Sequence, residues 1–294
     1  MSISLAISLF GDFYLAANEH PMTGLNSERL QALLAFILLH RDAPQARQQV
    51  AVQLWPEAND ADAKANLRRR RHELKHAIPN VDRWFRVETK TIQWSSDEHC
   101  YLDIEQFETA ITLAEQSFAT PGTDAQPALE QAAKVYAGDL LPSCYDDWIV
   151  PYRDHLRQQA IAGLDQLITL RMTSGDRRLA IGYAQQLQRI DPLYEPAYAH
   201  LMRLHAQEGD RASALRVYHQ CMTTLQVELG VNPSPTTTCK LYEDLLILDE
   251  TLSPPTCTAS EPVQAPDLSR TGSLPPIRSG FPSTSVPLVG RERE

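Results

Sequence analysis

An α+β domain followed by an all-α domain is the fold class that the sequence predicts. Two short strand-like runs open the chain, and three helical patterns and a second pair of strand-like runs follow them. From Asp103 onward the spacing of apolar residues is helical throughout. A chain of 294 residues is long enough for about two domains of roughly 100 to 200 residues each.

The first strand is predicted by strict alternation. Every second residue from Ile3 to Leu9 is a leucine or an isoleucine, and small residues stand between them. This pattern is typical of a strand that is buried on one face. Gly11 and Asp12 end it and Phe13 begins a second run, which predicts an antiparallel pair.

Three helices and a hairpin are expected next. Ser27 is placed to cap the first helix through its hydroxyl, and leucines at helical spacing continue it to Leu38. The second helix covers residues 47–54 and ends at Trp55, because the residue before a proline is disfavoured in the helical region. An acidic stretch precedes the third helix, and residues 84–88 and 91–94 predict a hairpin with its turn at Thr89 and Lys90.

The third helix carries a run of cations at residues 64–76, in a chain whose formal net charge is -10. With about 100° per residue, Leu67, Leu74 and Ile78 share one face. The opposite face presents Arg68, Arg69, His72 and His76. A basic run alone is often only a solvated surface. A cationic third helix between a short helix and a hairpin, however, is the order of a winged helix-turn-helix domain, whose third helix enters the major groove.

Each cation receives an expected role from this arrangement. Base readout is expected from Lys64, Arg68, Arg69 and His72, because arginine can pair bidentately with guanine. Phosphate contacts are expected from Arg70, Arg71, Lys75, His76, Arg86 and Lys90. His72 and His76 also have the spacing of metal ligands, but no third ligand is near, so DNA contact or solvation is expected and no metal or cofactor.

Residues 1–102 resemble the winged-helix DNA-binding domain of the OmpR/PhoB type. The resemblance rests on Leu54-Trp55-Pro56, on Ala65-Asn66-Leu67-Arg68 and on a hairpin region that ends in Leu102-Asp103. Arg71 departs from it, since such helices often have an apolar residue there. The resemblance implies that the acidic loop contacts the sigma or alpha subunit of RNA polymerase through Glu57, Asn59, Asp60 and Asp62. A plain surface connection is the alternative for this loop.

Residues 103–250 show a helical repeat. Gly175-Asp176 and Gly209-Asp210 lie 34 residues apart, which is the tetratricopeptide spacing. The alignment places Ala180 opposite Ala214 and Leu167 opposite Leu201, and Pro192 falls where that repeat has its terminal proline. An all-α tetratricopeptide-like domain is therefore expected.

The same region resembles the bacterial transcriptional activator domain (BTAD) in residues 136–142, 147–148, 190–195 and 228–235. A winged helix joined to this domain is similar to the Streptomyces antibiotic regulatory protein (SARP) family. The resemblance implies an activator without enzymatic activity that binds double-stranded promoter DNA, recruits RNA polymerase and forms a homodimer on direct repeats. The alternative is a tetratricopeptide-type interaction scaffold or signalling adaptor with a degenerate winged helix.

The remaining residues predict a longer regulator. Residues 251–287 are rich in Pro, Ser and Thr, as in a flexible linker. Residues 288–294 look like the start of a signal-transducing (STAND-type) nucleotide-binding ATPase, although no G-x-x-x-x-G-K-[ST] motif occurs in the chain. The five separated cysteines, the N-terminus without a signal peptide and the short apolar run at 33–39 predict a cytoplasmic protein outside the membrane.

Overall fold

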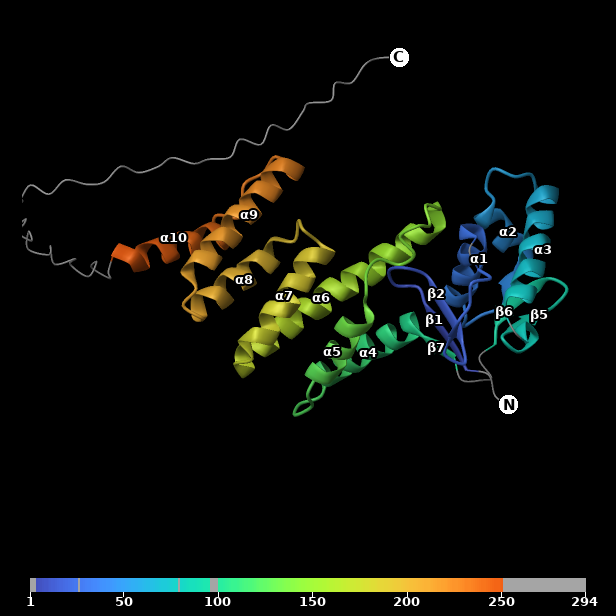
Figure 1. The fold of residues 1–294 in the computed structure, drawn as a ribbon, viewed down its shortest axis with the longest axis horizontal. Coiled ribbons are helices and arrows are strands. Elements are labelled where there is room, and N and C mark those ends of the chain that lie inside the picture. The colour runs from blue at the N-terminus through green and yellow to red at the C-terminus, as the bar shows by residue number, and fades with distance from the viewer. Residues whose placement is uncertain (1–3, 26, 79, 96–99, 251–294) are drawn as a thin grey trace, which may run out of the picture. The chain divides into compact units, whose positions relative to one another are not determined.

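The computed structural model describes residues 4–25, 27–78, 80–95 and 100–250 (Figure 1). The predicted linker at 251–287 and the predicted ATPase start at 288–294 lie outside the described residues, as does Ile3. The observed order of strands, three helices and a hairpin before a helical region agrees with the expected order.

The N-terminal sheet has the strand order β3-β2-β1-β7. As predicted, β1 (Leu5–Ser8) pairs with β2 (Tyr14–Ala17) in antiparallel fashion, and Leu5 and Ile7 are buried. β3 (His20–Pro21) extends the sheet on one side. On the other side β7 (Cys100–Leu102) pairs in parallel with β1, so the chain returns to its first strand before the helical region begins.

Three helices follow: α1 (Glu28–Leu39), α2 (Arg47–Leu54) and α3 (Asp60–Ala77). Ser27 stands at the N-cap of α1, but the expectation that its hydroxyl caps the helix was wrong, because its side chain makes no capping hydrogen bond. Instead the Ser27 carbonyl accepts the N–H groups of Leu30 at 2.8 Å and Gln31 at 3.0 Å, so the backbone alone begins the first turn.

A second small sheet has the order β4-β6-β5. β5 (Phe85–Val87) and β6 (Thr91–Trp94) form the predicted hairpin, after a short 3-10 helix η1 (Val81–Arg83). β4 (Gln45–Ala46) pairs with β6 immediately before α2 begins. This pairing holds the N-terminus of α2 against the hairpin.

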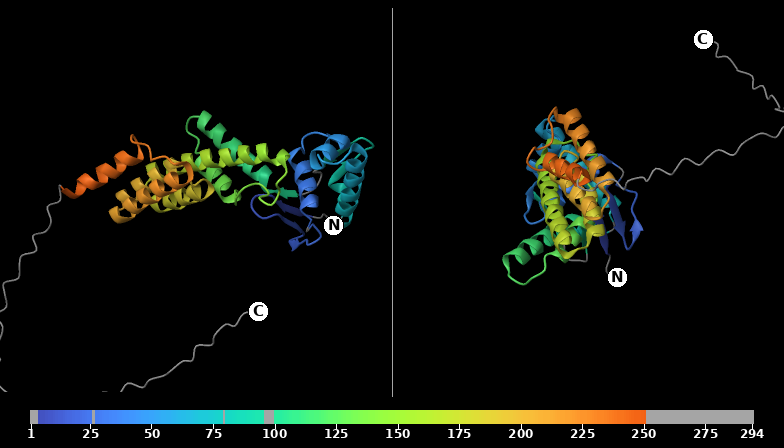
Figure 2. Two further views of the ribbon diagram at one scale, coloured as in Figure 1. Left: turned by 90° about the horizontal axis from the view of Figure 1, so that it is seen from above. Right: turned by 90° about the vertical axis from the view of Figure 1, so that its left-hand side faces the viewer.

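The helical region contains α4 (Asp103–Ala119), α5 (Gln126–Val135), the short 3-10 helix η2 (Asp147–Ile149), α6 (Val150–Ser174), α7 (Arg177–Ile190), α8 (Glu195–Gln207), α9 (Arg211–Leu229) and α10 (Thr238–Glu250). Consecutive helices pack side by side (Figures 1 and 2). Ala180 and Ala214 are both fully buried, as are Leu167 and Leu201. All four positions that the predicted repeat aligns are therefore buried, as paired helices require.

One apolar core connects the two regions. It extends from Leu5 through α1, α2 and α3 to Ala160 on α6. At the start of α4 the buried Asp103 carboxylate accepts the N–H groups of Leu9 at 2.7 Å and Phe10 at 2.9 Å. Burial raises the pKa of Asp103, and these backbone hydrogen bonds oppose that shift. The division at residue 102 stays a prediction, and the core is continuous across it.

Candidate nucleic-acid interface

The N-terminus of α3 is stabilised locally. Asn59 is its N-cap, and the Asn59 Oδ1 accepts the N–H of Asp62 at 2.9 Å. Asp60 and Asp62 lie in the first turn, where carboxylates interact favourably with the positive end of the helix dipole. Of the four expected polymerase contacts, Asp60 and Asp62 therefore belong to α3, and Glu57 and Asn59 lie in the connection between α2 and α3.

The expected faces of α3 are confirmed. Leu67, Leu74 and Ile78 are at most 2% exposed and pack into the core. Arg68, Arg69, His72 and His76 are exposed on the opposite side. Arg70 and Arg71 are partly buried at the margins between the two faces. The helix thus presents a cationic surface because its apolar residues anchor the other side.

Four of the cations on α3 bind nearby carboxylates. The ion pairs are Lys64 with Asp60 at 2.6 Å, Arg69 with Glu73 at 3.2 Å, Arg70 with Glu73 at 2.5 Å and Lys75 with Asp82 at 2.9 Å. The hydrogen bond from Arg70 lowers the pKa of Glu73. The side chains in these pairs are 26% to 77% exposed, so solvent screens the pairs and a phosphate can compete for the cations.

Arg68 and Arg71 have no acidic partner among the residues that the structure describes. Their charges act on Arg47, the first residue of α2. Burial lowers the pKa of Arg47, and repulsion from Arg71 and Arg68 lowers it further. Uncompensated positive charge therefore gathers where α2, α3 and the hairpin meet.

A groove of about 520 Å³ lies at this meeting point. Its cations are Arg47 from α2, Lys64 and Arg68 from α3, and Lys90 from the hairpin turn, and no aspartate or glutamate lines it. Arg47 is fixed there because its N–H donates to the Lys90 carbonyl at 2.9 Å and its guanidinium donates to the Thr89 carbonyl at 3.1 Å. The arrangement is suited to a polyanion.

Arg47 and its neighbour Gln48 line the groove but were not predicted from the sequence as site residues. The sequence did contain one indication of this site. An arginine at the first position of a helix interacts unfavourably with the helix dipole, so its presence there suggests a role other than stability. Of the other predicted residues, Arg86 is exposed on β5, outside the lining of the groove.

The side chains of the two histidines of α3 are in contact. The Nε2 atoms of His72 and His76 lie 3.2 Å apart on the exposed face. Within the described residues, no group of three or more His, Cys, Asp or Glu side chains is placed to hold a metal ion.

Residues 102–246 match the family model of the bacterial transcriptional activator domain. The region begins at the end of β7 and includes nearly all of α4 to α10. The match covers just under half of the chain, in the region where the sequence resembles this domain.

The structure of Mycobacterium tuberculosis EmbR in complex with a low-affinity phosphopeptide is similar to this chain, with a TM-score of 0.63 and 20% sequence identity. The match covers 84% of this chain and 66% of that chain, so this chain spans just under two thirds of the EmbR chain. The shared fold extends over both regions of the described structure.

Two further structural matches have low TM-scores. The TPR2AB domain of yeast Sti1 in its pHSP90 complex matches with a TM-score of 0.31 and 18% identity over 67% of this chain and 61% of that chain. The MamA protein matches with a TM-score of 0.23 and 18% identity over 45% of this chain and 81% of that chain. Among curated protein sequences no match was found. None of the helices in the described parts of the chain combines the length and apolarity needed to cross a membrane.

Proposed function

We propose that this chain is a transcriptional activator that binds promoter DNA through a winged helix formed by α1, α2, α3 and the β5–β6 hairpin. The acid-free groove carries this proposal, because it joins cations from α2, α3 and the hairpin on one surface. DNA binding by such a surface is dominated by phosphate contacts and depends steeply on salt.

In this proposal α3 enters the major groove. Arg68 is the leading base reader, since it is exposed and its guanidinium has no acidic partner in the described structure. Arg69 and His72 flank it on the exposed face. The DNA backbone follows the groove, where Arg47, Lys64 and Lys90 contact phosphates. Lys64, which the sequence predicts as a base reader, is thus proposed as a phosphate contact.

Activation would use other surfaces. Glu57 and Asn59 in the connection after α2 and Asp60 and Asp62 in the first turn of α3 are all exposed and are the candidates for a contact with RNA polymerase. The activator domain would support pairing of two copies on direct repeats. An activator of this type catalyses no reaction.

Fluorescence anisotropy of a labelled duplex from the upstream region of the chain's own gene tests DNA binding. We expect affinity to fall steeply between 50 and 200 mM salt and the double variant Arg68→Ala, Arg69→Ala to lose at least 10-fold. Arg178→Ala, which removes an exposed charge from α7, is the control and should bind like the wild type. Intact binding by the double variant would show that α3 is not the reading helix.

A second candidate is an interaction scaffold without DNA binding. Exposed apolar side chains at the end of α9 favour it, since Val227 is 74% and Leu229 is 54% exposed. The same titration separates the two functions, because a scaffold shows no salt-dependent binding to the duplex.

A further inference from the structure

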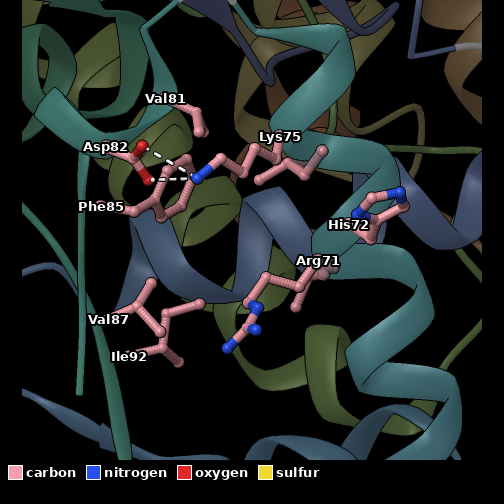
Figure 3. Close-up of a pocket in the computed structure, with 10 residues that line it drawn as sticks. Arg71, His72, Lys75, Val81, Asp82, Phe85, Val87 and Ile92 are labelled. Atoms are coloured by element: carbon pink, nitrogen blue, oxygen red, sulfur yellow. Dashed lines mark hydrogen bonds and ion pairs between the residues drawn. The ribbon is translucent and has the colours of Figure 1, made fainter.

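A more enclosed pocket of about 200 Å³ lies between α3 and the β5–β6 hairpin (Figure 3). Its apolar lining consists of Leu33, Leu74, Val81, Phe85, Val87 and Ile92. An apolar cavity of about 150 Å³ is enough to hold benzene in a protein interior. The pocket therefore has room for one substituted ring, and it is smaller than the sites that take drug-sized ligands.

Arg71 supplies a positive charge to this apolar lining. Its guanidinium points toward Val87 and Ile92, as Figure 3 shows. The other cation at the pocket is Lys75. It forms an ion pair with Asp82, since its Nζ lies 2.9 and 3.1 Å from the two carboxylate oxygens. Arg71 has no acidic partner among the described residues, so its hydrogen-bond donors are available to a ligand.

We propose that this pocket binds a small organic carboxylate with a single apolar ring. The ring would pack on Leu74, Phe85 and Ile92, and the carboxylate would accept hydrogen bonds from the planar guanidinium fork of Arg71. An inorganic anion lacks the apolar body for the pocket, and a neutral ring lacks the charge for Arg71. Both features of the site thus select the same ligand class.

The ligand would also regulate DNA binding, a consequence that rests on the proposed function. Arg71 lies at this pocket and Arg68, three residues earlier on α3, lies at the groove, so a carboxylate on Arg71 removes one positive charge close to the groove. Because this region is the proposed phosphate surface, the occupied pocket would weaken DNA binding. Occupancy itself is independent of DNA and is measured without it.

Saturation-transfer NMR titrations of the full chain without DNA test the pocket, with 4-methylbenzoate as the probe. We expect saturable binding of 4-methylbenzoate that is at least 10-fold tighter than binding of the neutral 4-methylbenzamide. Arg71→Gln should weaken 4-methylbenzoate binding at least 10-fold. Arg68→Gln removes the same charge from the exposed face of α3 and should change it less than 2-fold.

The proposal is overturned by equal affinity for the acid and the amide, by unchanged binding in Arg71→Gln, or by equal losses in the two variants. The comparison of acid and amide uses the wild-type chain, so it does not depend on how a variant folds. A chain that binds the probe but no duplex would contradict the proposed function and leave the pocket assignment standing. A chain that binds the duplex but not the probe would contradict the pocket alone.

Discussion

The Tyr152 hydroxyl on α6 donates a hydrogen bond to the Nε2 atom of His40 at the end of α1, over 2.8 Å. The Nδ1 atom of the same imidazole donates to the Phe36 carbonyl at 2.8 Å, so the neutral ring has one tautomer. Two ion pairs accompany this contact, Arg29 with Asp146 at 2.6 Å and Arg41 with Glu108 at 2.5 Å. The proposed DNA-binding region is thus joined to the helical region by polar contacts as well as by the shared core.

Tyr152→Phe tests how much this contact stabilises the chain. The variant leaves the Nε2 atom of His40 without its donor, and we expect the free energy of unfolding to fall by about 1 kcal/mol. Urea unfolding at neutral pH measures the change. Tyr145→Phe is the control, because Tyr145 is 88% exposed, and it should stay within about 0.5 kcal/mol of the wild type. Equal effects of the two variants would mean that the hydroxyl of Tyr152 contributes nothing.

Glu73→Gln should strengthen DNA binding. Glu73 holds both Arg69 and Arg70, and its loss leaves two guanidinium groups on α3 for the duplex. We expect roughly 3- to 10-fold tighter binding at 0.1 M salt, with a steeper salt dependence by about one phosphate contact. Anisotropy at several salt concentrations measures both effects. Glu208→Gln changes the net charge equally at the end of α8 and should leave both unchanged; the same gain in this control would indicate a long-range charge effect only.

Local sequence patterns predicted the features that depend on residues close together in the chain. The spacing of Leu67 and Leu74 predicted the buried face of α3, and the exposure of Arg68 followed from the same geometry. Ser27 was misjudged because residue type gives the preference for an N-cap position and does not decide whether the hydroxyl makes the bond.

Pairings between distant residues were beyond these patterns. The parallel register of Leu5 with Cys100 and the pairing of Gln45 with Ile92 depend on the tertiary fold. For the same reason the place of Arg47 beside Lys90 was missed, since the β4–β6 pairing brings them together. The pocket around Arg71 also requires two distant elements, α3 and the hairpin.

Asp103→Asn tests the buried carboxylate at the start of α4. The amide has one acceptor oxygen and would turn N–H groups toward backbone donors, so we expect about 1 to 3 kcal/mol lower stability at pH 7. Asp12→Asn, at an exposed position, is the control and should be neutral. Chemical denaturation of the two variants and the wild type gives the comparison.

The pH dependence of this variant has a definite sign. Because burial raises the pKa of Asp103, the folded chain binds its proton more tightly than the unfolded chain does. The contribution of Asp103 to stability is complete below the ordinary aspartate pKa of about 3.9 and is lost as the pH rises through the folded value. The variant lacks this titration, so its deficit should be wider at pH 3 than at pH 7. A deficit that grows with pH would show that the backbone hydrogen bonds outweigh burial.

Two glycines inside helices should respond differently to the same substitution. A Cβ at Gly182 on α7 has nothing within 4 Å, so Gly182→Ala should raise the free energy of unfolding by about 0.5 to 1 kcal/mol through helix propensity. A Cβ at Gly163 on α6 would lie 3.3 Å from Ile111 Cδ1 and 3.5 Å from Leu129 Cδ2. Gly163→Ala should therefore gain less, because crowding of α6 against α4 and α5 offsets the propensity. Thermal and urea unfolding compare the two variants. Equal gains in stability would mean that Ile111 and Leu129 do not crowd a Cβ at Gly163.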